Sequence, residues 1–107
     1  MISVGPLPKE LGATFVKSLN LSFNAFDGEI PEEFGDFEMI ELIDLSENKL
    51  IGIVPMSLRK LVGTLRALKL KGNSQLCGDI PIELNGLDVI SIEGTQIVGE
   101  SIYSRDD

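Results

Sequence analysis

The stretch IDLSENKLIGIVPMSL, residues 43–58, carries the pattern that decides the fold. As a template it reads L-x-L-S-x-N-x-L-x-G-x-I-P-x-x-L, in which aliphatic residues replace one another. The template also fits residues 19–34, which lie 24 residues earlier, and residues 68–84, where one residue is inserted before Leu76. A period of about 20–29 residues with aliphatic residues around an asparagine is typical of a solenoid, in which each copy buries its apolar side against its neighbours.

The template divides the chain into coils of one domain. Residues 1–15 hold a partial repeat, residues 16–39, 40–64 and 65–86 hold the next three, and residues 87–107 hold a degenerate terminal repeat. In that last repeat Thr95 takes the place of the asparagine, and Ser101-Ile102 takes the place of Ile-Pro. A length of 107 residues with 43% hydrophobic residues is consistent with one folded domain.

Each template position predicts a local structure. The L-x-L segments alternate inward and outward side chains and are expected to form short strands. The asparagine suits the bend that follows, because its amide bonds neighbouring backbone groups and because it tolerates unusual φ/ψ values. The glycine lets the chain curl closely, and the proline after Ile ends backbone pairing. The closing x-x-L-x-x-L predicts a 3₁₀ turn or short helix on the opposite side.

These repeats resemble leucine-rich repeats of the plant-specific type, over roughly residues 5–102. The resemblance implies an α/β fold, namely a right-handed solenoid with short parallel β-strands on the concave face and 3₁₀ or irregular turns on the convex face. It also implies a second, irregular layer of strands from the Leu-x-Gly-x-Ile-Pro segments. Members of this family occur mostly as ectodomains of receptor kinases and receptor-like proteins, and as secreted inhibitors of cell-wall hydrolases.

The chain departs from that family at its ends. Family members carry more repeats, a signal peptide and cysteine-paired caps, whereas this sequence begins inside a repeat and has Cys77 as its single cysteine. The residues from Asn73 to Gly78 resemble a segment found near the end of many such arrays, yet Cys77 has no partner. We expect a fragment of a longer array, whose uncapped solenoid ends expose core and offer a route to oligomerisation.

Charge and hydropathy exclude two classes of partner. The net charge of −8 argues against nucleic acid, because phosphate binding needs a basic footprint. No apolar run approaches the length of a membrane helix, and we expect no membrane contact by this segment. The charges are also segregated, with nine acids and no Lys or Arg between Asp27 and Glu47, and then six basic residues and no acid between Lys49 and Lys71.

The sequence argues against catalysis. It contains no histidine, which rules out Ser-His-Asp or Cys-His nucleophilic sites and histidine-based zinc sites. Cys77 has no candidate base beside it and is read as a small buried hydrophobe. The carboxylates lie at variable exterior positions where nothing would raise a pKa. We therefore predict a non-enzymatic chain with no cofactor, no metal and no catalytic residue.

The predicted binding surface is the concave face. Stacked parallel strands bring equivalent outward residues of neighbouring coils to within about 4.8 Å of one another. This predicts a partly apolar column, a polar column and a mixed column, with Phe23 and Glu47 on the rim. The candidate residues are, by column, Ser18, Leu42, Ala67 and Val89; Asn20, Asp44, Lys69 and Ser91; and Ser22, Ser46, Lys71 and Glu93.

Lys69 and Lys71 allow two interpretations. Their ammonium groups point to the same side, with Arg66 nearby, and they resemble the basic pair with which some plant peptide receptors hold a ligand's carboxylate. Alternatively, the acidic and basic blocks pair between coils, Asp44 with Lys69 on the concave face and Asp36 with Lys60 at the back. Exposed pairs of this kind contribute only about 0–1 kcal/mol each.

These observations favour a module that binds a protein or peptide on its concave face as part of a receptor-like ectodomain. The alternatives are a secreted inhibitor of a cell-wall hydrolase and a structural spacer. The resemblance implies an extracellular or cell-surface location, although cytoplasmic members of the wider superfamily exist. The triplet Asn20-Leu21-Ser22 is an N-glycosylation sequon, which is either a used site in a secreted chain or a by-product of the L-x-L-S template.

Overall fold

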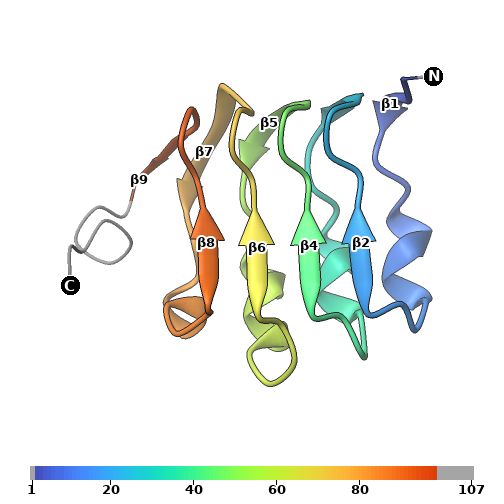
Figure 1. Ribbon diagram of the computed structural model, residues 1–107, viewed down its shortest axis with the longest axis vertical. Coiled ribbons are helices and arrows are strands. Elements are labelled where there is room, and N and C mark those ends of the chain that lie inside the picture. Colours follow the sequence, from blue (N-terminus) through green and yellow to red (C-terminus); the bar gives the residue numbers. More distant parts are fainter. Residues whose placement is uncertain (1, 99–107) are drawn as a thin grey trace.

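The computed structural model, which describes residues 2–98, is a solenoid that alternates between two parallel sheets (Figure 1). One sheet has the strand order β2-β4-β6-β8 and the other β1-β3-β5-β7-β9. The strands are β1 (Val4–Pro6), β2 (Ser18–Asn20), β3 (Ala25–Gly28), β4 (Leu42–Asp44), β5 (Lys49–Ile53), β6 (Ala67–Lys69), β7 (Gln75–Asp79), β8 (Val89–Ser91) and β9 (Gln96–Val98). The 3₁₀ helices are η1 (Lys9–Ala13), η2 (Glu32–Asp36), η3 (Met56–Leu61) and η4 (Ile82–Leu84).

The β2-β4-β6-β8 sheet is the predicted L-x-L layer, and we call it the concave sheet after the face that such layers form. Its four strands pair without stagger, so that Leu19, Ile43, Leu68 and Ile90 lie side by side. Leu19, Ile43 and Leu68 are buried, while the residues that flank them are not. The alternation and the register expected from the sequence are therefore confirmed.

The second sheet is more regular than expected, because the Leu-x-Gly segments form five paired strands behind the concave sheet. Its register is staggered, because each residue pairs with the residue two positions before its template equivalent in the next coil. Asp27 pairs with Lys49, and Ile51 pairs with Gln75.

Glycines at the template position adopt left-handed backbone angles, for example φ 80° at Gly52. A Cβ at Gly52 would lie 2.9 Å from Cγ of Glu29, whose side chain lies over it.

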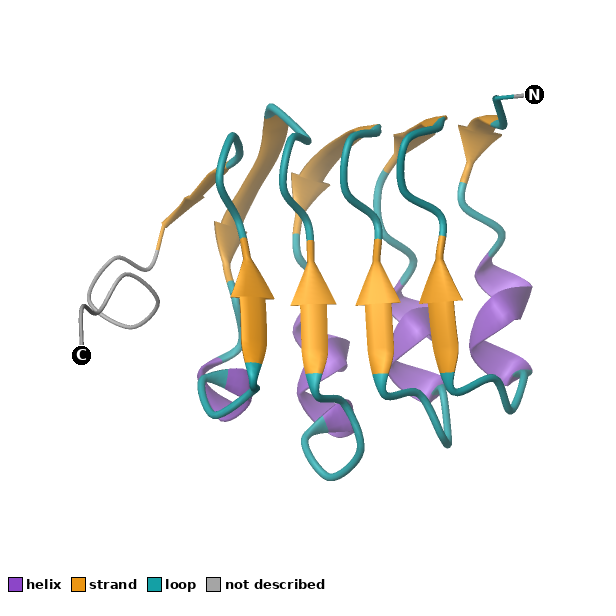
Figure 2. Cartoon of the chain, viewed as in Figure 1, coloured by secondary structure: helices purple, strands orange, loops and turns teal. Residues whose placement is uncertain are grey.

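Each 3₁₀ helix follows a template proline and lies on the side away from the concave sheet (Figure 2). Neighbouring helices approach closely at Gly12 and Gly35, which are not part of the template. A Cβ at Gly12 would lie 1.9 Å from the carbonyl oxygen of Glu33, and one at Gly35 would lie 2.4 Å from that of Ser57. These distances allow only a hydrogen at either position, which is the reason for glycine there. None of the helices described between residues 2 and 98 is long and apolar enough to cross a membrane.

One core runs through the solenoid between the sheets and the helices. Phe34 and Phe37 pack edge to face with ring centroids 5.3 Å apart, and the aliphatic template residues of the following coils are fully buried. Burial falls in the last described coil, where Leu87, Ile90, Ile92 and Ile97 are only partly buried. No further coil covers them within residues 2–98.

The template asparagines tie successive coils together. The Asn73 side chain is fully buried, and its Nδ2 donates to the carbonyl oxygens of Leu70 in its own coil and Leu45 in the preceding coil, both at 2.9 Å. Its Oδ1 accepts from the backbone N–H of Leu50 at 3.1 Å. Asn48 does the same one coil earlier, donating to Leu45 and Leu21 and accepting from Phe26.

Asn73→Ala should lower the free energy of unfolding by at least about 2 kcal/mol, because the Leu50 N–H and the Leu70 carbonyl lose the bonds to the buried amide, and the Leu45 carbonyl keeps only its bond from Asn48. Asn24→Ala is the matched control. Asn24 is only part-buried, so water can replace its bonds to Leu21, Ser22 and Ser3, and we expect a loss of about 1 kcal/mol or less. Urea unfolding followed by circular dichroism measures both variants, and equal losses would contradict a special role for the buried amide.

Candidate binding surface

The concave sheet brings the predicted columns together in the predicted order. Ser18, Leu42, Ala67 and Val89 are register partners, and so are Asn20, Asp44, Lys69 and Ser91. The third column follows from backbone bonds just past the strands. Glu47 donates its N–H to the Lys71 carbonyl at 2.7 Å, and Gly72 donates to that of Glu93 at 2.9 Å.

Most of these residues are accessible, and Ser46 is the exception. Its exposed fraction is 8%, so its expected role as an outward contact is wrong. The Ser46 hydroxyl turns back along its own strand and donates to Asp44 Oδ1 at 2.6 Å, and its N–H donates to the same oxygen at 3.0 Å. Ser22 and Asn20 form the same arrangement one coil earlier, with the same hydroxyl distance of 2.6 Å.

Lys69 and Lys71 form no ion pair with any residue between 2 and 98. Asp44 is the register neighbour of Lys69, as expected, but the predicted ion pair between them is not formed, since Asp44 Oδ1 accepts two bonds from Ser46. At the back of the solenoid the predicted pair between Lys60 Nζ and Asp36 Oδ1 is confirmed, at 2.8 Å. Within residues 2–98 the two lysines therefore stand unpaired beside the apolar column.

Glu93 lies at the far end of the third column, and its carboxylate is stabilised locally. Its own backbone N–H, the Ser91 hydroxyl at 3.0 Å and the charge of Lys71 lower the pKa of Glu93, against a small opposing effect of burial. The concave face thus presents Asp44, then two lysines, then a carboxylate held in its charged form.

The rim residues have a backbone conformation that the sequence did not indicate. In each bend the residue before the asparagine, or before Thr95 in the last coil, has a positive φ. This residue is Phe23 (φ 58°) and Glu47 (φ 57°) in the first two bends and a glycine, Gly72 and Gly94, in the other two. The carboxylate of Glu47 lies against Gly72, where a Cβ would be 2.6 Å from Glu47 Cδ. Phe23 is 73% exposed.

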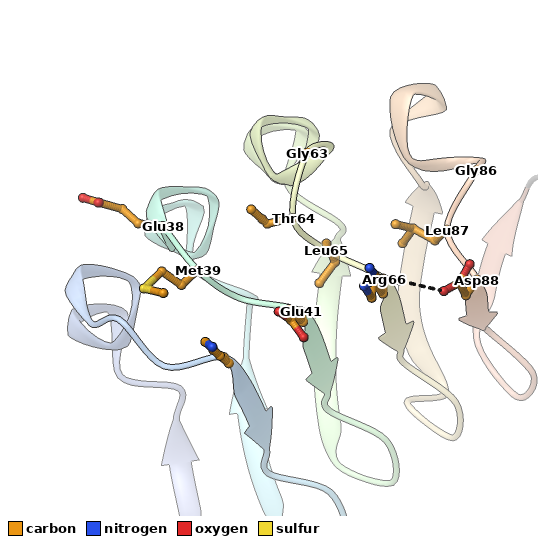
Figure 3. A pocket seen from close by; sticks show the side chains of 11 residues that line it. Glu38, Met39, Glu41, Gly63, Thr64, Leu65, Arg66, Gly86, Leu87 and Asp88 are labelled. Atoms are coloured by element: carbon orange, nitrogen blue, oxygen red, sulfur yellow. Dashed lines mark ion pairs between the residues drawn. The ribbon is translucent and has the colours of Figure 1, made fainter.

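A hollow of about 570 Å³ adjoins the concave face where the chain leaves the 3₁₀ helices and enters the strands (Figure 3). Its lining includes Lys17, Glu41, Arg66 and Asp88, each just before a concave strand. These four residues form a further column with alternating charge, in which Arg66 Nη1 lies 3.6 Å from Asp88 Oδ2. Apart from Arg66, the sequence analysis missed this column. Counting two residues back from the first leucine position of each L-x-L segment would have found it.

Residues 2–98 contain no group of three His, Cys, Asp or Glu side chains that could hold a metal ion. Cys77 is a half-buried free thiol on β7. What this surface offers is polar and apolar contacts for another molecule.

Comparison with known proteins adds the context for this surface. The Leucine Rich Repeat family model matches residues 15–37 and 39–61. A receptor protein kinase-like protein from Arabidopsis thaliana is 43% identical over 75 residues, which make up 69% of this chain and 10% of that protein. The chain spans a tenth or less of the length of the first curated relatives that it matches.

Two solved structures show the same fold. A structure of the plant peptide hormone receptor RGFR1 in complex with RGF2 superposes with a TM-score of 0.81 at 31% identity, over 88% of this chain and 16% of the other. A chain of the BIR3–SERK2 complex from Arabidopsis thaliana gives a TM-score of 0.77 at 32% identity, over 94% of this chain and 54% of the other.

Phe23→Asn should raise the free energy of unfolding by about 1 kcal/mol, because asparagine tolerates the left-handed region better than phenylalanine. Little apolar burial is lost at so exposed a ring. The same change at Phe26, which is buried on β3, should cost about 3 kcal/mol or more. Thermal unfolding of both variants tests this, and destabilisation by Phe23→Asn would show that the ring is packed.

Ser91→Ala should raise the pKa of Glu93 toward its ordinary value, because the variant loses the hydroxyl donor. A depressed carboxyl pKa contributes stability above the unfolded pKa, and that stability is lost as pH falls through the folded pKa. For a mostly exposed group the contribution is small. The titration is read from the Glu93 side-chain NMR signal, with Ser18→Ala as the control. An unchanged pKa would contradict the assigned bond.

Proposed function

The chain belongs to the leucine-rich-repeat family, and on that premise we propose that its concave face binds a peptide or a protein segment without catalysis. The observation that carries this proposal is that Lys69 and Lys71 form no ion pair with another described residue and lie beside Leu42, Ala67 and Val89. Two accessible cations next to an apolar column suit a ligand that combines an acidic group with an apolar side chain.

The relatives support this assignment. The RGFR1 structure is that of a plant peptide hormone receptor in complex with RGF2, and the other is that of the BIR3–SERK2 complex. We infer that this chain lies outside the cell as part of a receptor-like ectodomain. Nothing among residues 2–98 specifically favours the hydrolase-inhibitor or the spacer alternative.

The expected ligand polarity follows from the order of charges across the columns. An acidic group of the ligand would lie over Lys69 and Lys71, since Asp44 on one side and Glu93 on the other disfavour a second one. A basic or polar group would then lie toward Asp44 and Glu47. This arrangement gives the ligand a direction across the coils.

Lys69→Glu combined with Lys71→Glu should weaken peptide binding at least tenfold, because attraction to an acidic group becomes repulsion. The probes are peptides selected from a phage-displayed random library on the immobilised chain, and affinity is measured by calorimetry. Lys9→Glu combined with Lys60→Glu changes the net charge equally on the convex side and should leave affinity unchanged. Equal losses in the two double variants, or selected peptides insensitive to both, would overturn the proposal.

A further inference from the structure

The charged residues beside the hollow form a regular row, which we call the flank column. Lys17, Glu41, Arg66 and Asp88 each come directly before a strand of the concave sheet. Because the first residues of those strands are register partners, the four residues follow one another at about 4.8 Å per coil. Backbone bonds carry this register into the column, since the Glu41 N–H donates to the Lys17 carbonyl at 2.7 Å and the Arg66 N–H to the Glu41 carbonyl at 2.8 Å. The column therefore reads positive, negative, positive, negative.

The charges of the flank column are accessible and only loosely paired within the chain. Arg66 Nη1 lies 3.6 Å from Asp88 Oδ2, and the two side chains are 71% and 70% exposed (Figure 3). Lys17 and Glu41 form no ion pair with another described residue. Glu41 and Arg66 are exposed although each has a described coil on either side. The column is therefore open to another molecule in the middle of the array.

An order of alternating charge is complementary to itself when it is read backward. If a second copy of this chain faces the column with its coils in the reverse order, Glu41 meets Arg66 of the second copy and Lys17 meets Asp88 of the second copy. If the coils run in the same order, every charge meets its own kind. A two-fold axis that runs along the strands, midway between β4 and β6, produces the reverse order and makes each contact twice.

The connections that lead from the 3₁₀ helices into the strands differ in length along the same face. Measured between buried template residues, they span residues 34–40, 58–65 and 84–87, so that the second is the longest and the third the shortest. The second continues η3 into a turn in which two N–H groups donate to the Leu61 carbonyl at 3.0 and 2.9 Å. It projects beyond its neighbours in Figure 2, and the third connection lies recessed beside it.

The same two-fold axis gives the exposed apolar residues of these connections a counterpart. It sets the first connection of one copy opposite the short third connection of the other. Met39, which is 42% exposed, then faces Gly86 and the half-buried Leu87 of the second copy. Val62, which is exposed on the projecting connection near the axis, faces its own equivalent. One axis thus pairs the charges and covers the apolar side chains of this flank.

We propose that two copies of this chain associate through this flank, in reverse order about a two-fold axis between β4 and β6. Two Glu41–Arg66 pairs and two Lys17–Asp88 pairs join the copies, and Met39 of each fills the recess over Gly86 of the other. Exposed ion pairs contribute little affinity each, so they fix the order of the coils while apolar contact supplies the attraction. The net charge of −8 opposes association, and the dimer is therefore weak and depends on concentration.

The first test is sedimentation velocity at 0.15 M NaCl, where repulsion beyond about 8 Å is screened. The wild-type chain should dimerise as its concentration rises to about 1 mM. Glu41→Arg and Arg66→Glu should each weaken the dimer at least tenfold, because two facing pairs become like-charged. An equimolar mixture of these two variants should dimerise again, since every arginine then faces a glutamate. Circular dichroism confirms that the variants fold, as expected for exposed sites.

Glu32→Arg and Lys9→Glu are the matched controls, because they make the same charge changes on η2 and η1, away from the column. Each alone should dimerise as the wild type does. A wild-type chain that stays monomeric at about 1 mM would overturn the proposal. So would a dimer that Glu41→Arg and Arg66→Glu leave intact, which would indicate association through the solenoid ends. A mixture of the two variants that stays monomeric would contradict the reverse order.

The second test is zero-length crosslinking with a carbodiimide, which joins an amine to a carboxylate in direct contact. Lys17 and Asp88 of one chain are three strand spacings apart, about 14 Å, so a link between them forms only between copies. A mixture of ¹⁵N-labelled and unlabelled chains should give this crosslinked peptide with mixed labels, and Asp88→Asn should abolish it. Crosslinked dimers without it would overturn the proposed axis. Neither test involves Lys71, which lies past the other end of β6, so the outcome is independent of peptide binding on the concave face.

Discussion

The structure depends on a single side-chain amide per coil. Asn48 and Asn73 each donate to the strand-end carbonyl of their own coil and to that of the coil before, and each accepts a backbone N–H of the preceding coil's second strand. Three bonds from one rigid amide fix the translation from coil to coil. The zero stagger of β2, β4 and β6, and with it the alignment of variable residues into columns, agrees with this link, and β8 keeps the same register against β6. At Thr95 this link is reduced to bonds within the last coil, with Ile92 and Ile97.

This constraint explains how far the sequence could predict the structure. The L-x-L alternation and a spacing of 24 or 25 residues between equivalent positions determine the register, so the pairing of Ser18 with Leu42 and of Asp44 with Lys69 could be predicted from the sequence. The division into repeats remains a prediction, and Gly99 and Ser101-Ile102 of the terminal repeat lie outside the described residues. The burial of Ser46 and the absence of an Asp44–Lys69 ion pair could not be predicted, because both depend on which rotamer a variable side chain adopts once the coils are stacked.

The rim shows a second reason for the limits of sequence reasoning. The asparagine was expected to tolerate the unusual backbone angles of the bend, yet the left-handed conformation belongs to the residue before it, and in the last coil to the residue before Thr95. Gly72 and Gly94 fit that position, whereas Phe23 and Glu47 do not. The asparagine cannot take this place, since its own backbone must aim the amide across to the preceding coil. A variable residue thus carries the strain, and the template gives no sign of it.

The two charge blocks illustrate how the coil converts a linear pattern into a surface. Acidic and basic residues 24 or 25 positions apart become neighbours, and at the back they pair, as Asp36 and Lys60 do. On the concave face the same juxtaposition yields no ion pair, because the hydroxyl and N–H of Ser46 hold Asp44 toward the end of its own strand. A bond within one coil therefore competes with an ion pair between coils. Since an exposed ion pair contributes at most about 1 kcal/mol, two hydrogen bonds to one carboxylate oxygen suffice to decide that competition and to leave Lys69 available.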